Sequence, residues 1–114
     1  MSIARTKHVI DRYFDLMGRQ ADFAESYSPD VTWLIADTGE VIQGADTVRD
    51  YIIGLHAALT DTRTRRFVVG EDSVYLEGDC APSAGGGDGR VHYCVAYDVR
   101  DHVIVAMRCY GLGA

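Results

Sequence analysis

Apolar positions near the start of the chain recur at every third or fourth residue, which is the spacing of a helix that buries one face. This pattern predicts a helix over residues 4–18, with an apolar stripe formed by Val9, Ile10, Tyr13, Phe14, Leu16 and Met17. A second, shorter helix is expected over residues 21–28. Pro29 should end it, because the residue before a proline avoids helical dihedral angles. A third helix, capped by Asp46, is expected over residues 46–59.

The other segments are rich in β-branched and aromatic residues, which is typical of strands. Two of them flank a short turn and predict a hairpin before the third helix, at residues 30–37 and 41–44. Four more strands are expected after that helix, over residues 65–70, 73–81, 90–99 and 102–110. Helices followed by a run of antiparallel strands indicate an α+β fold in which the helices pack on one face of a sheet.

Length and charge limit the possible architectures and partners. The 114 residues suffice for one domain with one hydrophobic core, and no linker divides residues 1–114. A net charge of −6 argues against nucleic acid as a partner, because nucleic-acid binding depends first on a basic surface. The one basic cluster (Arg63, Arg65 and Arg66) is short and has acidic neighbours, so a solvated strand edge is the simpler interpretation.

The N-terminal segment and the cysteines indicate where the protein works. No apolar run is long enough for a membrane span, and the charged N-terminus does not have the pattern of a secretion signal. We therefore expect a cytoplasmic protein that does not act at a membrane. The three cysteines are widely spaced and suggest reduced, buried thiols: Cys80, Cys94 and Cys109. Neither they nor the histidines have the spacing of metal ligands, so no metal and no cofactor are expected.

Four segments stand in a recognisable order along the chain. They are VIDRYFDLM (9–17), YSPDVTWLI (27–35), GADTVRDYI (44–52) and YDVRDHVIVAMRCY (97–110). In this order they resemble the nuclear transport factor 2-like superfamily, and within it the SnoaL-like and ketosteroid isomerase-like branch. The resemblance implies a cone: a strongly bent antiparallel sheet wrapped around about three helices, with an internal pocket for a small hydrophobic molecule. It also implies a homodimer formed through the sheet. Such a fold supports many functions, so activity has to be argued from individual residues.

The resemblance to ketosteroid isomerases supplies two candidate catalytic residues. Tyr13 matches the tyrosine that holds the substrate oxygen in those enzymes, where a phenol can donate to a developing oxyanion. The position of their general base falls on Ile35, which cannot take up a proton. Asp37 lies two residues further on and could replace the base if the strand stays regular. The alternative is that Asp37 belongs to the turn.

Two acidic residues in one predicted strand form a second candidate. Glu77 and Asp79 lie two residues apart, so regular strand geometry puts both carboxylates on one face, together with Tyr75. Inside an apolar pocket the two carboxylates would raise each other's pKa, and one could act as acid and the other as base. The alternative is a solvent-exposed face, because Val74 and Leu76 at the alternate positions suit a core.

The same strand argues against epoxide hydrolysis. Epoxide hydrolases of this fold carry an Arg-x-Asp pair on this strand and a second aspartate on the last strand. The matching positions hold Glu77, Asp79 and Cys109, so the arginine and the second acid are both missing.

The remaining candidates come from the third helix and the later strands. His56 follows Ile52 by one helical turn and could move a proton near neutral pH, or be an ordinary boundary histidine. Arg108 could point inward toward an acid, or outward where dimers of this fold meet. The glycine-rich stretch 85–89 is expected to be a hairpin loop at the edge of the pocket. The residues expected to line an aromatic pocket, or else to form only core, are Trp33, Ile35, Tyr75, Glu77, Tyr93, Val95 and Tyr97.

Two functions remain open at this point. The first is a cofactor-free acid–base isomerase, cyclase or dehydratase that acts on a compact hydrophobic, cyclic substrate. Tyr13 would hold the oxygen, and Asp37, Asp79 or His56 would move the proton. The second is a non-catalytic ligand-binding or accessory dimeric domain of the same fold. An ionisable group with a shifted pKa inside the cavity would favour the enzyme.

Overall fold

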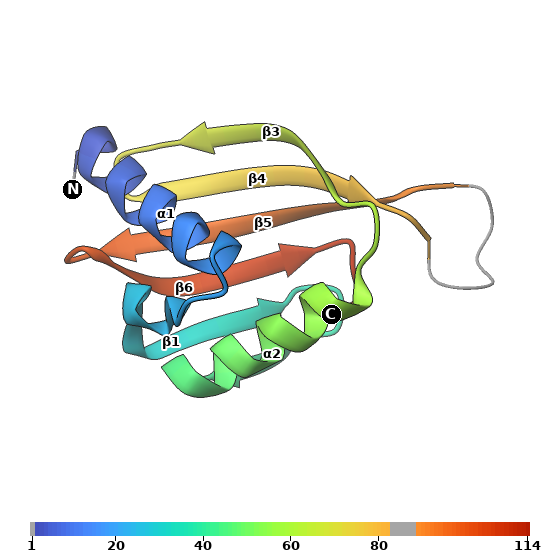
Figure 1. Cartoon of the computed structure of the whole chain (residues 1–114), viewed down its shortest axis with the longest axis horizontal. Helices are drawn as coiled ribbons and strands as arrows, with labels where there is room; N and C mark the ends of the chain where they lie inside the picture. Colours follow the sequence, from blue (N-terminus) through green and yellow to red (C-terminus); the bar gives the residue numbers. More distant parts are fainter. Residues whose placement is uncertain (1, 83–88) are drawn as a thin grey trace.

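The computed structural model describes residues 2–82 and 89–114, and in these residues two α-helices pack on one face of a six-stranded sheet (Figure 1). The helices are α1 (Ile3–Gly18) and α2 (Ala45–Ala58), and a short 3-10 helix, η1, covers Phe23–Ser26. The strands are β1 (Tyr27–Ile35), β2 (Glu40–Gln43), β3 (Arg63–Val69), β4 (Ser73–Cys80), β5 (Val91–Arg100) and β6 (Val103–Tyr110). The α+β class expected from the sequence is confirmed.

The strands lie in the order β2-β1-β6-β5-β4-β3. Strands β3 to β6 form the expected antiparallel run. However, β1 pairs with β6 in parallel, with Trp33 opposite Met107 and Ile35 opposite Cys109, so the sheet is mixed and not purely antiparallel. Local hydrophobic periodicity cannot reveal this pairing, because it joins the first long strand to the last.

The helix count differs from the expectation of about three. Residues 21–28 form only the turn-like η1, and β1 already begins at Tyr27. Pro29 therefore lies inside β1, where the register against β6 shifts between Tyr27 and Thr32. A proline has no N–H to give to a ladder, and such an irregularity tolerates it.

The start of α2 also differs in detail from the prediction. The cap is Gly44 and not Asp46, and its φ of +104° is a conformation that favours glycine. Asp46 instead lies in the first turn of the helix, where its charge is favourable near the helix N-terminus.

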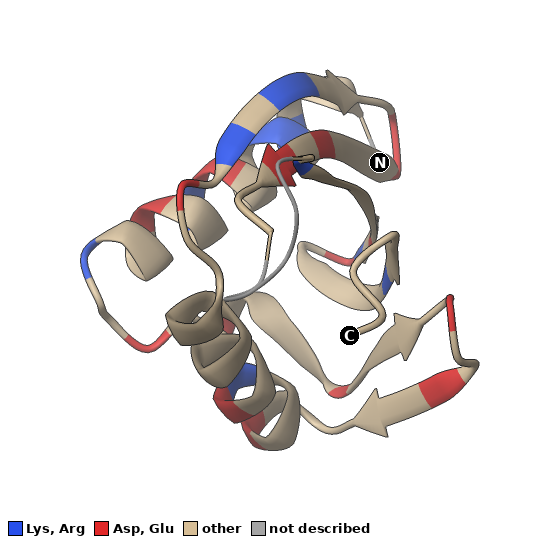
Figure 2. Cartoon of the chain, turned by 90° about the vertical axis from the view of Figure 1, so that its right-hand side faces the viewer, with Lys and Arg blue, Asp and Glu red and all other residues tan. Residues whose placement is uncertain are grey.

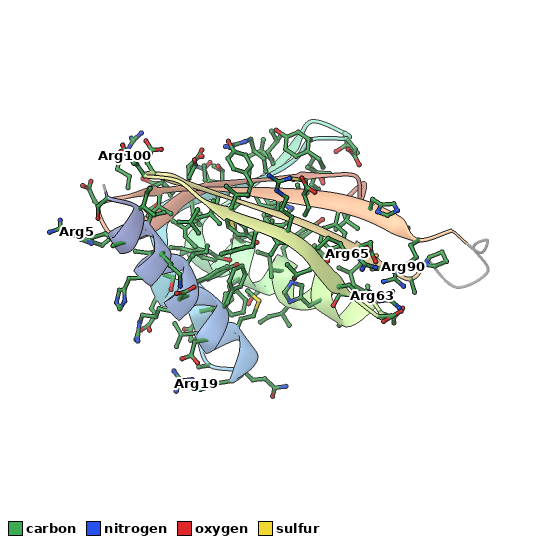
Figure 3. The ribbon with its side chains drawn as sticks, turned by 90° about the horizontal axis from the view of Figure 1, so that it is seen from above. Arg5, Arg19, Arg63, Arg65, Arg90 and Arg100 are labelled. Carbon is green, nitrogen blue, oxygen red and sulfur yellow. The ribbon has the colours of Figure 1, made fainter. Side chains whose placement is uncertain are left out.

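The core lies between the two helices and one face of the sheet. Helix α2 packs on β1, whereas α1 packs on β3, β4 and β6. The sheet is curved when seen end-on (Figure 2), and both helices lie on the same side of it (Figure 3). The most deeply buried side chains include Ile10, Tyr13, Val31, Val48, Val74, Ile104 and Met107. All three cysteines are free thiols. None of the helices in the described residues is long and apolar enough to cross a membrane.

Candidate active site

A cavity of about 310 Å³ lies between the helices and the sheet face that they cover. Its volume is at the lower end of the range typical of small-molecule pockets. Eight of its lining side chains are apolar: Phe14, Met17, Ile52, Leu55, Leu59, Leu76, Val95 and Leu112. The others carry a polar atom: Tyr13, Trp33, His56, Thr62, Thr64, Tyr93 and Tyr97. No aspartate or glutamate is among the described residues that line the cavity.

Tyr13 projects from α1 into a cluster of buried aromatic rings. It is only 1% exposed, and its hydroxyl lies 2.7 Å from the hydroxyl of Tyr27. In such a pair one hydroxyl donates and the other accepts, and the accepting hydroxyl keeps its own proton for a further hydrogen bond. Tyr13 is among the residues that line the cavity, whereas Tyr27 is not.

Burial keeps these phenols neutral. Loss of solvent around the ring raises the pKa of Tyr13 well above its usual range, and the neighbouring Tyr27 and Tyr97 add to the shift. Burial raises the pKa of Tyr27 and of Tyr97 as well. At neutral pH, Tyr13 is therefore a hydrogen-bond donor and not a base.

His56, on α2, lines the same cavity but is itself exposed, which puts it at the mouth. Although His56 is exposed overall, the surrounding protein removes part of the water around its imidazole, and this desolvation of the charged form lowers the pKa below the usual value of 6.5. The imidazole is therefore neutral near pH 7 and can accept a proton. Among the candidate catalytic residues, the structure brings Tyr13 and His56 together at one cavity.

Asp37 does not reach the cavity. Strand β1 ends at Ile35, so the strand parity that would have aimed Asp37 inward is lost. Its exposed carboxylate instead accepts hydrogen bonds from the backbone N–H groups of Gly111, at 3.1 Å, and Gly113, at 2.8 Å. This placement agrees with the alternative of a turn residue, and Asp37 fastens the C-terminal segment to the turn.

Glu77 and Tyr75 lie on the outer face of the sheet, contrary to the expectation that they line the pocket. Both are exposed, whereas Val74 is fully buried and Leu76 reaches the cavity from the other face of β4. Strand alternation is the physical reason, because the apolar positions take the face that the helices cover. The face that carries Glu77 and Tyr75 is therefore open to solvent.

Asp79 is buried on this outer side and is held by two arginines. One carboxylate oxygen accepts from Arg65 Nε at 2.5 Å, and the other accepts from Arg90 Nε. The two guanidinium groups shield the carboxylate from solvent. Asp79 nevertheless lies close to the surface, because the Arg65 side chain that covers it is itself about half exposed. The bond to Arg65, helped by Arg90 and opposed by desolvation, lowers the pKa of Asp79 to about 2. Figure 3 shows Arg65 and Arg90 together at one end of the sheet. An ionised carboxylate with both oxygens engaged is a poor general base, and Asp79 is not part of the cavity wall.

The structure also places the remaining candidates. Trp33, Tyr93, Val95 and Tyr97 line the cavity, whereas Ile35 is buried in the core without reaching it. Arg108 lies on the outer face, where it pairs with Asp98 at 2.6 Å and 3.2 Å and not with either acid of β4. Apart from Gly89, the stretch 85–89 lies outside the described residues.

Several wall residues escaped the sequence analysis. Phe14 and Met17 share the apolar stripe of Tyr13, so helical periodicity could have indicated them. Thr62 and Thr64 carried no such signal, because both lie before the strand predicted at residues 65–70, whereas β3 begins at Arg63. Within residues 2–82 and 89–114, no group of three or more His, Cys, Asp or Glu side chains could hold a metal ion.

Comparison with known proteins agrees with this architecture. The steroid delta-isomerase of Pseudomonas aeruginosa has a TM-score of 0.78 at 15% identity, covering 93% of this chain and 78% of that chain. An NTF2-like protein from Burkholderia xenovorans LB400 has a TM-score of 0.73 at 15% identity, with coverages of 96% and 91%. A candidate SnoaL-like polyketide cyclase from Mesorhizobium loti has a TM-score of 0.63 at 20% identity, with coverages of 96% and 99%.

Similarity at these identities shows the fold alone. This fold is the one expected from the resemblance of the four sequence segments to nuclear transport factor 2-like proteins. No curated protein sequence matches the chain. Residues 10–107, most of the chain, match the family model of the SnoaL-like domain. The protein therefore belongs to the SnoaL-like domain family.

Proposed function

We propose that the protein is a cofactor-free acid–base enzyme, an isomerase, cyclase or dehydratase, that acts on a compact hydrophobic cyclic substrate. His56 is the proposed base, and Tyr13 is the proposed donor to the substrate oxygen. One observation carries the proposal: a histidine with a lowered pKa and a buried neutral phenol line the same largely apolar cavity.

The proposed chemistry begins with removal of a proton from the carbon next to a carbonyl group. Neutral His56 takes this proton, the C–H electron pair becomes part of a C=C bond, and negative charge collects on the oxygen. Tyr13 donates a hydrogen bond to that oxygen. The imidazolium then returns the proton to another carbon in an isomerisation, or to a departing hydroxyl in a dehydration. A positioned base contributes about 10²–10⁴-fold to such a rate, and an oxyanion donor about 10²–10³-fold.

A second candidate function is ligand binding without turnover. It is favoured by one observation, namely that the described wall of the cavity contains no carboxylate. Enzymes that abstract protons from carbon often use such a group, and here only His56 is available for the role.

We also propose that two copies of the chain associate through the outer face of the sheet. Tyr75 and Tyr110 are 45% and 44% exposed on this face, opposite Ala96 and Cys94 of β5. Sedimentation equilibrium would test the association, with Tyr75→Glu as the disrupting change. A wild-type protein that stays monomeric across the concentration range would contradict it.

Proton exchange is the direct test of the enzymatic proposal. The protein is incubated in D2O with 1-tetralone, a bicyclic ketone, and loss of the α-proton signal is followed by 1H NMR. We expect exchange above the buffer rate, a fall of at least about 10²-fold in His56→Gln, and a smaller fall in Tyr13→Phe. His102→Gln is the matched control, because His102 is exposed in the β5–β6 turn. Exchange that survives in His56→Gln would reject His56 as the base. Binding of the ketone without exchange would favour the second function.

A further inference from the structure

The indole of Trp33 is the large aromatic wall that β1 contributes to the cavity. Trp33 is 4% exposed and lies on the covered face of the sheet, between Ile42 of β2 and Met107 of β6. Above it lies the Tyr51 ring of α2, with ring centroids 6.3 Å apart and an interplanar angle of 50°. These neighbours hold the indole in place from three elements.

The indole N–H of Trp33 is buried and unpaired. Among the described residues, Trp33 Nε1 is the one buried side-chain nitrogen or oxygen that has no hydrogen-bond partner. Burial removes the hydrogen bond that this N–H would make to water, and nothing in the described part of the chain replaces it. Buried polar groups in proteins are nearly always paired, so an unpaired one calls for a reason.

The other buried polar side chains show that this core otherwise satisfies its polar groups. The hydroxyls of Tyr13 and Tyr27 pair with each other, and the Thr6 hydroxyl donates to the backbone oxygen of Glu71. Asp79 accepts from two arginines. The unpaired donor thus belongs to a residue whose side chain forms part of the cavity wall.

We propose that Trp33 Nε1 donates a hydrogen bond to an acceptor oxygen of the bound ligand and so makes Trp33 a specificity-determining residue. The inference rests on the proposed function in so far as it assumes that the cavity holds a small molecule. It narrows the ligand class to apolar ring compounds that carry a carbonyl or comparable acceptor oxygen, and it disfavours pure hydrocarbons. A carbonyl oxygen has two lone pairs and can accept from Trp33 and Tyr13 together.

The single tryptophan gives this proposal a direct readout, because the chain has one indole N–H resonance in a 1H–15N NMR spectrum. The wild-type protein is titrated with 1-tetralone and, separately, with tetralin, which has the same bicyclic frame without the oxygen. We expect the ketone to move the indole proton downfield and tetralin to leave it without a downfield shift. Equal effects of the two probes would overturn the proposal.

Dissociation constants from the same titrations give the second measurement. Trp33→Phe keeps an aromatic wall and removes the donor, so the preference for the ketone over tetralin should fall by about fivefold to tenfold. Tyr51→Phe is the matched control. It removes a hydroxyl from the ring that lies above Trp33, and Tyr51 is not among the described residues that line the cavity. This variant should keep the preference for the ketone over tetralin. If Trp33→Phe keeps the full preference for the ketone over tetralin, the proposal is overturned. The proposal is also overturned if the indole resonance shifts in Tyr51→Phe but does not shift when the ketone is added.

The outcomes for Trp33 and for catalysis can be told apart. A ketone-specific indole shift without α-proton exchange would support the Trp33 hydrogen bond and reject the catalytic role of His56. Exchange that continues together with an unchanged ketone preference in Trp33→Phe would support catalysis and reject the Trp33 hydrogen bond.

Discussion

The hydroxyl pair of Tyr13 and Tyr27 allows a quantitative test of how the cavity is supported. Both side chains are at least 95% buried, and their hydroxyls lie 2.7 Å apart. Replacing either tyrosine by phenylalanine leaves the other hydroxyl buried without its partner, which costs about 1–3 kcal/mol. Replacing both removes the pair together, and this is far less costly than the two separate losses suggest. We therefore expect a favourable coupling energy in the double variant.

The expected loss of stability in each single variant can be converted into a shift of the melting temperature. An unfolding entropy of about 2.1 cal/mol/K per residue gives roughly 0.24 kcal/mol/K for 114 residues. Each single variant should therefore lower the Tm by about 4–12 °C, since 1–3 kcal/mol is divided by that entropy. The double variant should lie close to the less stable single variant or above it, and not at the sum of the two shifts.

The assay is thermal and urea unfolding of the wild type, Tyr13→Phe, Tyr27→Phe and the double variant, followed by circular dichroism. The slope of the urea transition should stay the same in all four, because a change in slope would indicate an altered unfolded or native state. Strictly additive losses would refute the reasoning, because additivity means that the two hydroxyls do not interact.

Three further predictions concern packing and pH. An added Cβ at Gly78 would lie 2.8 Å from the Tyr93 ring, so Gly78→Ala should destabilise the protein by about 1–3 kcal/mol in urea unfolding. Gly54→Ala is its control, with nothing within 4 Å of the added Cβ, and should instead stabilise α2 by roughly 0.5–1 kcal/mol. The lowered pKa of Asp79 means that its contribution to stability is present above its unfolded-state pKa of 3.8 and is lost as the pH falls toward about 2. The stability gap between wild type and Asp79→Asn should therefore narrow over that range, and a constant gap would contradict the ion pairs. The lowered pKa of His56 means that the unfolded chain binds more protons, so the wild type should lose stability relative to His56→Gln as the pH falls through 6.5. An NMR titration of His56 with a midpoint above 6.5 would contradict this.

Local patterns were sufficient to predict most elements of the fold. The apolar stripe of residues 4–18 and the β-branched segments predicted elements close to those observed, because each reflects one buried face. The parallel pairing of β1 with β6 was not accessible in this way, since it depends on how distant segments assemble. Pro29 was misleading, because a proline can end a helix or occupy an irregular strand, and only the register shift against β6 decides between them.

Strand parity was the most informative signal for the candidate site. The alternation of Val74 and Leu76 with the acidic residues of β4 favours a solvent-exposed face for Glu77, and the structure places it there. The environment of Asp79 could not be predicted, because its arginine partners come from β3 and from the residue before β5. Helical spacing alone was enough to predict that His56 lies near the apolar stripe of its helix. The unpaired nitrogen of Trp33 could not be predicted, because it depends on the positions of all the neighbours of the indole.

The pairing of Asp79 with two arginines has a consequence for protein engineering. The Asp79–Arg90 pair joins side chains 11 positions apart in the sequence, one near the end of β4 and one just before β5. It therefore holds the two strand ends at a fixed separation through contacts that do not involve the connecting segment. Lengthening a loop whose ends are already held costs little, because the entropy of closure grows only with the logarithm of loop length. A recognition peptide or a reporter tag can therefore be grafted between Cys80 and Arg90 without altering any of the described residues that line the cavity.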